Sequence, residues 1–255
     1  MKKISKFSEK LEEYIKKAEE ETGRPVLIKS VQNVGLGAIS SAFISDPECK
    51  RIHVEIVERD FFDQKKEKID RGDIEWAIAH EISHGFLCYK KKHYQFEFKS
   101  VFLLSKLEEN SVRLLFTMIE EALADKIMYE NNFQLLPKGY IDNLKGAIKM
   151  MQDGKDSYKN YDEYPLIFKN RFMVFTFIIA WGHLKYINLN GIEKKTIHKF
   201  LKMFQKSCPK QYEEAKKIEA IILENDIFTT EGFNKTIKKC LDLWNLTDLV
   251  RLYTC

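Results

Sequence analysis

The spacing of the hydrophobic residues changes near Asp73, and this change limits the possible folds more than any other feature of the chain. Before Asp73, short hydrophobic runs are bounded by turn residues, which is typical of β-strands. After it, hydrophobic residues recur at the three- and four-residue intervals of helices. We expect strands at 26–31, 38–44 and 51–57, and helices at 5–21, 74–91, 110–131, 140–152, 170–188, 193–206, 209–225 and 231–246. The sequence therefore predicts an α+β fold, with a small N-terminal β-sheet and a predominantly helical body.

The length and composition fit a globular protein. A chain of 255 residues suits a single domain. We expect one domain over 1–255 with two lobes, 1–92 carrying the sheet and 93–255 carrying most of the helices. Hydrophobic residues make up 44% of the chain and charged residues 31%, which is ordinary for a soluble protein.

Charge, hydropathy and cysteine usage exclude several classes of partner. The net charge of +4 arises from 42 basic and 38 acidic residues that are interleaved, so we expect no nucleic-acid partner. The most apolar run, from Phe172 to Leu184, is 13 residues long. A membrane span needs roughly 18, so this run predicts a buried helix. Five scattered cysteines without a CxxC pair, and no apolar segment after the N-terminal lysines, favour a cytoplasmic protein.

Two histidines four residues apart, His80 and His84, flank a glutamate in the sequence HEISH. On a helix these two positions share a face, so both imidazoles can bind one metal ion. Glu81 is rotated by about 100° from His80, which places its carboxylate beside a metal-bound water rather than on the metal. The sequence therefore predicts a Zn2+ site with Glu81 as general base. The alternative is a pair of core histidines with Glu81 at the surface.

A third ligand must come from elsewhere, because Leu87 and Lys90 stand where the pattern HExxHxxGxxH needs Gly and His. Glu121 is the only glutamate with an aspartate four residues later, at Asp125. On a helix the two share a face, so Glu121 can bind the metal while Asp125 hydrogen-bonds a ligating histidine. Glu120 is the fallback for the third ligand.

HEISH at 80–84, followed by EALAD at 121–125, resembles the gluzincins, the thermolysin-like clan of zinc metallopeptidases, and their small ImmA/IrrE-like members. The resemblance covers about residues 51–130. It implies a zincin-like fold, with Glu81 as the base, Asp125 beside the ligands, and zinc bound by His80, His84 and Glu121. The chain departs from the clan in two respects. It lacks the GxMEN aminopeptidase motif, and the 36 residues between His84 and Glu121 exceed the thermolysin spacing.

Several other residues are candidates for the chemistry. Peptidases of this kind need a donor for the oxyanion, usually His or Tyr. His183 is one candidate, although a histidine on so apolar a helix is more often a hydrogen-bonded core residue. Three tyrosines of the polar loop 153–165 are equal candidates: Tyr158, Tyr161 and Tyr164. Cys88 lies one turn beyond His84 and is a candidate metal ligand, although free cysteines are more often small buried hydrophobes. The remaining histidines are expected at the surface: His53, His93 and His198.

These features predict peptide-bond hydrolysis by zinc-activated water, acting on a peptide or protein that could add a strand to the N-terminal sheet. The alternative is a non-catalytic zinc-binding domain that senses metal or binds a partner. Glu81 favours the enzyme, because a structural zinc site does not need it and usually has four protein ligands. A helical interaction protein with a chance motif is the third possibility.

Overall fold

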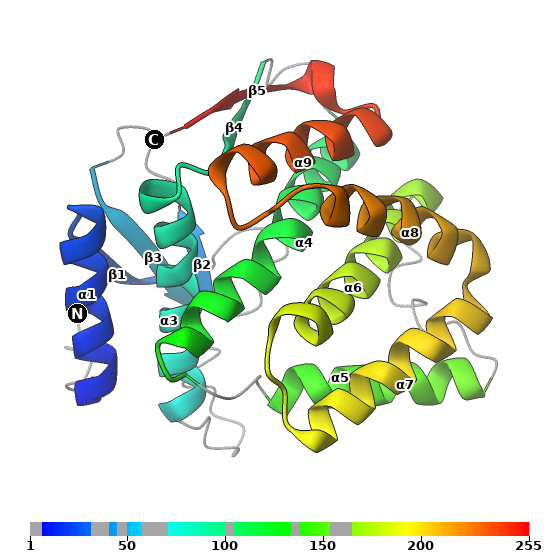
Figure 1. Ribbon diagram of the computed structural model, residues 1–255, viewed down its shortest axis with the longest axis horizontal. Coiled ribbons are helices and arrows are strands. Elements are labelled where there is room, and N and C mark those ends of the chain that lie inside the picture. The colour runs from blue at the N-terminus through cyan, green and yellow to red at the C-terminus, as the bar shows by residue number, and fades with distance from the viewer. Residues whose placement is uncertain are drawn as a thin grey trace. The chain divides into compact units, whose positions relative to one another are not determined.

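The computed structural model in Figure 1 describes residues 7–31, 41–44, 50–57, 71–99, 105–133, 138–153 and 165–254. The chain divides into two compact units. The first unit is formed by Met1–His93, Ile127–Leu135 and Thr254–Cys255, and the second by Tyr94–Lys126 and Leu136–Tyr253. The three loop tyrosines proposed as oxyanion donors, Tyr158, Tyr161 and Tyr164, lie outside the described residues.

The first unit is a small sheet packed with helices. Its elements are α1 (Glu9–Thr22), β1 (Val26–Val31), β2 (Ser41–Ile44), β3 (Ile52–Val57), α3 (Arg71–Gly85) and the π-helix η1 (Phe86–Lys90). β3 pairs in parallel with β1 and antiparallel with β2, so the strand order is β1-β3-β2 and β2 forms one edge of the described sheet. The alternation predicted for 51–57 is confirmed, since Ile52, Val54 and Ile56 are buried in the core of this unit.

Helix α1 supports α3 from the side. The Ser8 hydroxyl accepts a hydrogen bond from the Leu11 N–H and caps the start of α1. Gly23 ends the helix with φ 65°, in the left-handed region that favours glycine. The buried Tyr14 hydroxyl lies 2.8 Å from the Ser83 hydroxyl, within HEISH. Because Ser83 also donates to the Ala79 carbonyl, at 2.8 Å, the polar groups on this side of α3 are satisfied.

The end of α3 differs from the continuous helix expected over 74–91. The α-helix stops at Gly85 and continues as η1, whose bonding pattern includes the Lys91 N–H donating to the Phe86 carbonyl. After η1 the His93 N–H donates to the Leu87 carbonyl, and the His93 side chain is only 1% exposed. The prediction that His93 is at the surface is therefore wrong. Burial, together with the nearby charge of Lys91, lowers the pKa of His93 to about 3.

The second unit is almost entirely helical in its described residues. Its helices are α4 (Lys106–Glu130, the last turn of which belongs to the first unit), α5 (Lys138–Gln152), α6 (Leu166–Tyr186), α7 (Gly191–Ser207), α8 (Pro209–Glu224), α9 (Thr230–Leu243) and the short 3-10 helix η3 (Thr247–Leu249). A two-stranded antiparallel sheet joins β4 (Gln95–Phe98) to β5 (Val250–Tyr253). Within this unit α6 packs against α7 and α8, and α5 packs against α7.

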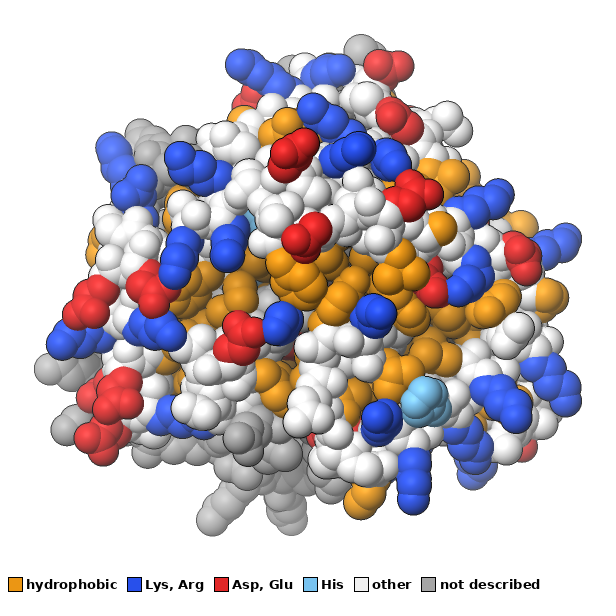
Figure 2. All heavy atoms as spheres, in the orientation of Figure 1, with side chains coloured by type: hydrophobic (Ala, Val, Ile, Leu, Met, Phe, Trp, Pro, Cys, Tyr) orange, Lys and Arg blue, Asp and Glu red, His pale blue; other side chains and the backbone are white. Residues whose placement is uncertain are grey.

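The apolar run at 172–184 lies within α6, as predicted for a buried helix, and its Val174, Phe177 and Ile178 are buried. Among the described helices, none combines the length and apolar character needed to cross a membrane. On the face drawn in Figure 2, basic and acidic side chains are interspersed with hydrophobic ones. The cysteines Cys88, Cys208 and Cys240 are buried and form no disulfide.

Candidate metal centre

Helix α3 places His80 and His84 one turn apart, and both are buried, with 6% and 7% of their surface exposed. Their Nε2 atoms are 3.2 Å apart and their rings are nearly perpendicular, at 81°. Two nitrogens that each lie about 2.0–2.1 Å from a tetrahedral zinc ion are about 3.3 Å from one another. The two imidazoles are therefore already spaced as two ligands of one ion.

Trp76 lies one turn before His80 on α3 and fixes the orientation of its ring. The indole stacks on the imidazole, with ring centroids 5.1 Å apart and an interplanar angle of 14°. Ile78 and Ile82, on either side of His80, are completely buried, so the helix cannot rotate without exposing them. Hydrophobic packing on α3 thus determines where the histidines point.

Glu81 is also buried, with 8% of its surface exposed. Its Oε2 accepts a hydrogen bond of 2.7 Å from the backbone N–H of Phe43, on strand β2. The alternative in which HEISH supplies two core histidines and a surface glutamate is therefore not met. A carboxylate held beside a histidine pair is the arrangement that a general base needs.

Helix α4 carries the two acidic residues of EALAD. Glu121 is half-buried and Asp125, one turn later, is 1% exposed. Asp125 Oδ2 lies 2.5 Å from Nε2 of His183, on α6, which is itself 3% exposed. We expected Asp125 to support a ligating histidine, and this bond to His183 was not anticipated. Sequence spacing could not reveal it, because 58 positions separate the two residues.

A close approach of α4 and α6 brings this pair together. Gly182 precedes His183, and a Cβ atom at Gly182 would lie 2.7 Å from the Cβ of Ala122. That separation is too short for two carbon atoms, so a glycine is needed at this point. Ala122 follows Glu121 directly, so the same contact fixes the part of α4 that carries the candidate ligand.

Tyr140, on α5, is a further candidate that the sequence did not indicate. Its ring meets the His183 ring edge-on, with centroids 5.0 Å apart. The Tyr140 hydroxyl and His183 Nδ1 are both buried and have no hydrogen-bond partner among the described residues. Burial and the charges of Asp125 and Glu121 raise the pKa of Tyr140, so its hydroxyl keeps its proton and remains a donor. The acidic neighbours that mark Tyr140 come from another helix, and no local motif signals them.

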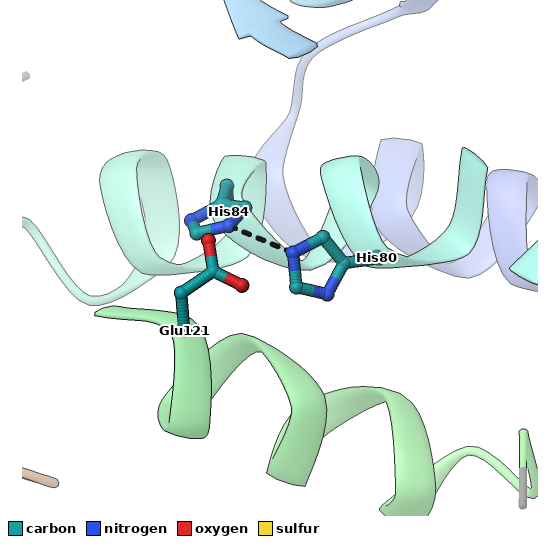
Figure 3. A group of neighbouring side chains, drawn as sticks. All are labelled: His80, His84 and Glu121. Atoms are coloured by element: carbon teal, nitrogen blue, oxygen red, sulfur yellow. Dashed lines mark hydrogen bonds between the residues drawn. The ribbon is translucent and has the colours of Figure 1, made fainter. Parts of the chain in front are cut away.

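One ligand atom each from His80, His84 and Glu121 lies within 4.8 Å of the others. Figure 3 shows the Glu121 carboxylate directed toward the two imidazoles. Among the described residues, this is the group of three potential metal ligands whose ligand atoms lie this close together. It contains Glu121 rather than Glu120. Two imidazole nitrogens and one carboxylate oxygen, with a fourth position open, are the donor set of catalytic zinc sites such as thermolysin.

Helix α4 is continuous from Lys106 to Glu130. From Ile127 onward it belongs to the first unit, and Met128 is completely buried in the hydrophobic core of that unit. The helix that carries Glu121 therefore ends in the core that also holds α3.

The remaining sequence candidates lie apart from this group. Cys88 is completely buried among hydrophobic residues of the first unit, as expected for a free cysteine. His198 is exposed on α7, as predicted. His53 is half-buried, with Nε2 3.4 Å from Glu55 on the same strand.

Comparisons with known proteins found no relative from which a role for these residues could be inferred. The chain matches no protein-family model, and comparisons with the curated proteins and with the solved structures found no match.

Proposed function

We propose that this protein is a gluzincin-type zinc metallopeptidase, with Zn2+ held by His80, His84 and Glu121. The observation that carries the proposal is the proximity of these three ligand atoms. Among the described residues the group contains three ligands and no fourth, which is the pattern of catalytic rather than structural zinc sites. Bound zinc would supply a Lewis acid and lower the pKa of water to roughly 7.

Glu81 has the role of general base in this proposal. It follows His80 directly on α3 and is buried, so its carboxylate acts in a site with little competing water. It accepts a proton from the attacking water and passes it to the leaving amine. The competing function, a zinc sensor that cleaves nothing, does not call for a buried carboxylate beside the ligands.

The proposed substrate is a peptide or protein in extended conformation. Strand β2 is an edge of the described sheet, and the Phe43 N–H on this strand donates to Glu81. An extended peptide that adds to an edge strand gains backbone hydrogen bonds without a particular side-chain sequence. A peptide on this edge would have its backbone beside the proposed base and would pair with the outward backbone groups of β2 other than the Phe43 N–H, which is bonded to Glu81.

Two groups in the second unit are the proposed donors to the oxyanion, His183 and Tyr140. Each has a buried polar atom without a hydrogen-bond partner among the described residues. Asp125 orients the His183 ring through Nε2, which leaves Nδ1 for a further contact. Donors that are fixed before the reaction stabilise developing charge at little cost in reorganisation.

The variant Glu81→Gln tests this function, because glutamine keeps the shape of glutamate and cannot take a proton. A cleavable peptide is first found by mass spectrometry of a mixed peptide library treated with the zinc-loaded wild type. The variant is expected to retain its zinc and to lose roughly a hundredfold to ten-thousandfold in kcat. Glu130→Gln, at an exposed position of α4, is the matched control.

Equal cleavage by wild type and Glu81→Gln would remove Glu81 from the mechanism. A wild type that holds zinc and cleaves nothing across the library would favour the sensor instead.

A further inference from the structure

The pairing of β2 with β3 shows which way the backbone of Phe43 points. Phe43 lies opposite Val54 in an antiparallel pair. In such a pair, the N–H and C=O of a residue either both bond to the partner or both point away from it. Because the Phe43 N–H donates to Glu81, Phe43 is of the second kind, and its N–H lies on the side of β2 that faces away from β3.

The Phe43 side chain has a separate environment from its amide. Its ring packs against the hydrophobic core of the first unit and meets the Tyr89 ring, with centroids 6.2 Å apart. Core packing of the ring therefore fixes the position of the strand, while the amide reaches sideways to α3. Alanine removes the ring alone and proline removes both the ring and the amide donor, so a comparison of the two isolates the amide.

We propose that the backbone N–H of Phe43 is a positioning group for Glu81, an inference that rests on the proposed peptidase function. A carboxylate with two equivalent oxygens can rotate, and a bond from Oε2 to a rigid strand amide selects one orientation. Hydrogen bonds to charged groups are stronger than neutral ones, so this amide makes a substantial contribution to the orientation of the carboxylate.

The variants Phe43→Pro and Phe43→Ala separate the amide from the ring. Proline lacks the N–H and is tolerated on edge strands where the N–H faces outward. Alanine keeps the N–H and carries the cost of the lost ring. We expect kcat for the peptide found with wild type to be roughly tenfold to a hundredfold lower in Phe43→Pro than in Phe43→Ala. Similar zinc content in the two variants is expected, because the metal ligands are not changed.

A spectroscopic measurement tests the hydrogen bond itself and needs neither cleavage nor the proline variant. In protein labelled with 15N-phenylalanine, the Phe43 amide signal is assigned by its absence from Phe43→Leu. We expect its proton to move upfield in Glu81→Gln, because a neutral amide oxygen is a weaker acceptor than a carboxylate.

The outcomes distinguish this inference from the function on which it rests. Equal kcat in the proline and alanine variants, or an amide signal indifferent to Glu81→Gln, overturns the positioning role and leaves the peptidase intact. Loss of cleavage in Glu81→Gln with an unchanged Phe43 signal likewise overturns the positioning role, while Glu81 remains the base of the peptidase. A zinc-loaded wild type that cleaves no peptide overturns the peptidase function, and the positioning of a base falls with it.

Discussion

Glu120 and Glu121 are neighbours on α4, yet only Glu121 has a carboxylate oxygen in the group with His80 and His84. Adjacent positions on a helix differ by about 100° in direction, so at most one of the two can face a given point. The sequence favoured Glu121 because Asp125 follows it by one turn. In the structure Asp125 lies in the same unit as Glu121, the second unit, and is hydrogen-bonded to His183.

Replacement of the two glutamates should therefore give different zinc affinities. Glu121→Gln is expected to weaken zinc binding by more than about a hundredfold, the upper limit for residues that only support a ligand. Glu120→Gln keeps all three ligands and serves as the control. Competition with a chromophoric chelator measures both affinities, and a greater loss in Glu120→Gln would mean that the face of α4 has been misassigned.

Tyr140 and Tyr14 make a matched pair for separating function from stability. The Tyr14 hydroxyl is bonded to Ser83, whereas the Tyr140 hydroxyl has no partner among the described residues. Removing a satisfied buried hydroxyl costs about 1 kcal/mol, whereas removing an unsatisfied one relieves a desolvation penalty of roughly 1–3 kcal/mol.

We therefore expect Tyr140→Phe to unfold at higher urea concentration than wild type, and Tyr14→Phe at lower. If Tyr140 also donates to the oxyanion, Tyr140→Phe should lose about a hundredfold in kcat despite its greater stability. A Tyr140→Phe variant that is less stable than wild type would show that the hydroxyl has a structural partner.

Among the secondary-structure elements, those with a local signal were predicted closely. The strands at 26–31 and 52–57 and the helices α7 and α8 agree with expectation to within two residues. The β4–β5 pair was missed because Gln95 pairs with Tyr253, and no local pattern records a partner so distant in the sequence. The change from α- to π-helix after Gly85 was missed for a similar reason, and with it the burial of His93.

The residues of the candidate site also fall into two groups, those with a local sequence signal and those without one. His80, Glu81 and His84 follow from spacing on one helix, and Glu121 from a second local spacing. The bonds from Phe43 to Glu81 and from Asp125 to His183 join separate elements, so only the folded chain reveals them. Tyr140 belongs to this second kind, because its role depends on acidic groups of α4.

The α4–α6 contact makes a prediction about two glycines. Gly182→Ala would force a Cβ against Ala122, which has no longer side chain that could move aside, whereas Gly146, on α5, has nothing within 4 Å. We expect Gly182→Ala to lose about 1–3 kcal/mol through overpacking. Gly146→Ala should gain up to about 1 kcal/mol from helix propensity. Urea unfolding measures both, and equal stability of the two variants would contradict the close approach.

Zinc binding should also change the stability of the folded chain, because its ligands lie on α3 and α4 and come together only after folding. A ligand that binds only the native state, at a free concentration a thousand times its Kd, adds about 4 kcal/mol. We expect zinc to raise the Tm of the wild type and to have no such effect on His84→Ala. An equal rise in both proteins would indicate that zinc binds elsewhere.

Metal content shows whether HEISH supplies two ligands of a stoichiometric zinc site. Elemental analysis of dialysed protein, after reconstitution with zinc, compares wild type with His80→Ala, His84→Ala and the exposed control His198→Ala. We expect one zinc ion per chain in wild type and His198→Ala, and much less than one in the other two variants. Full zinc content in both His80→Ala and His84→Ala, or no zinc in reconstituted wild type, would contradict it.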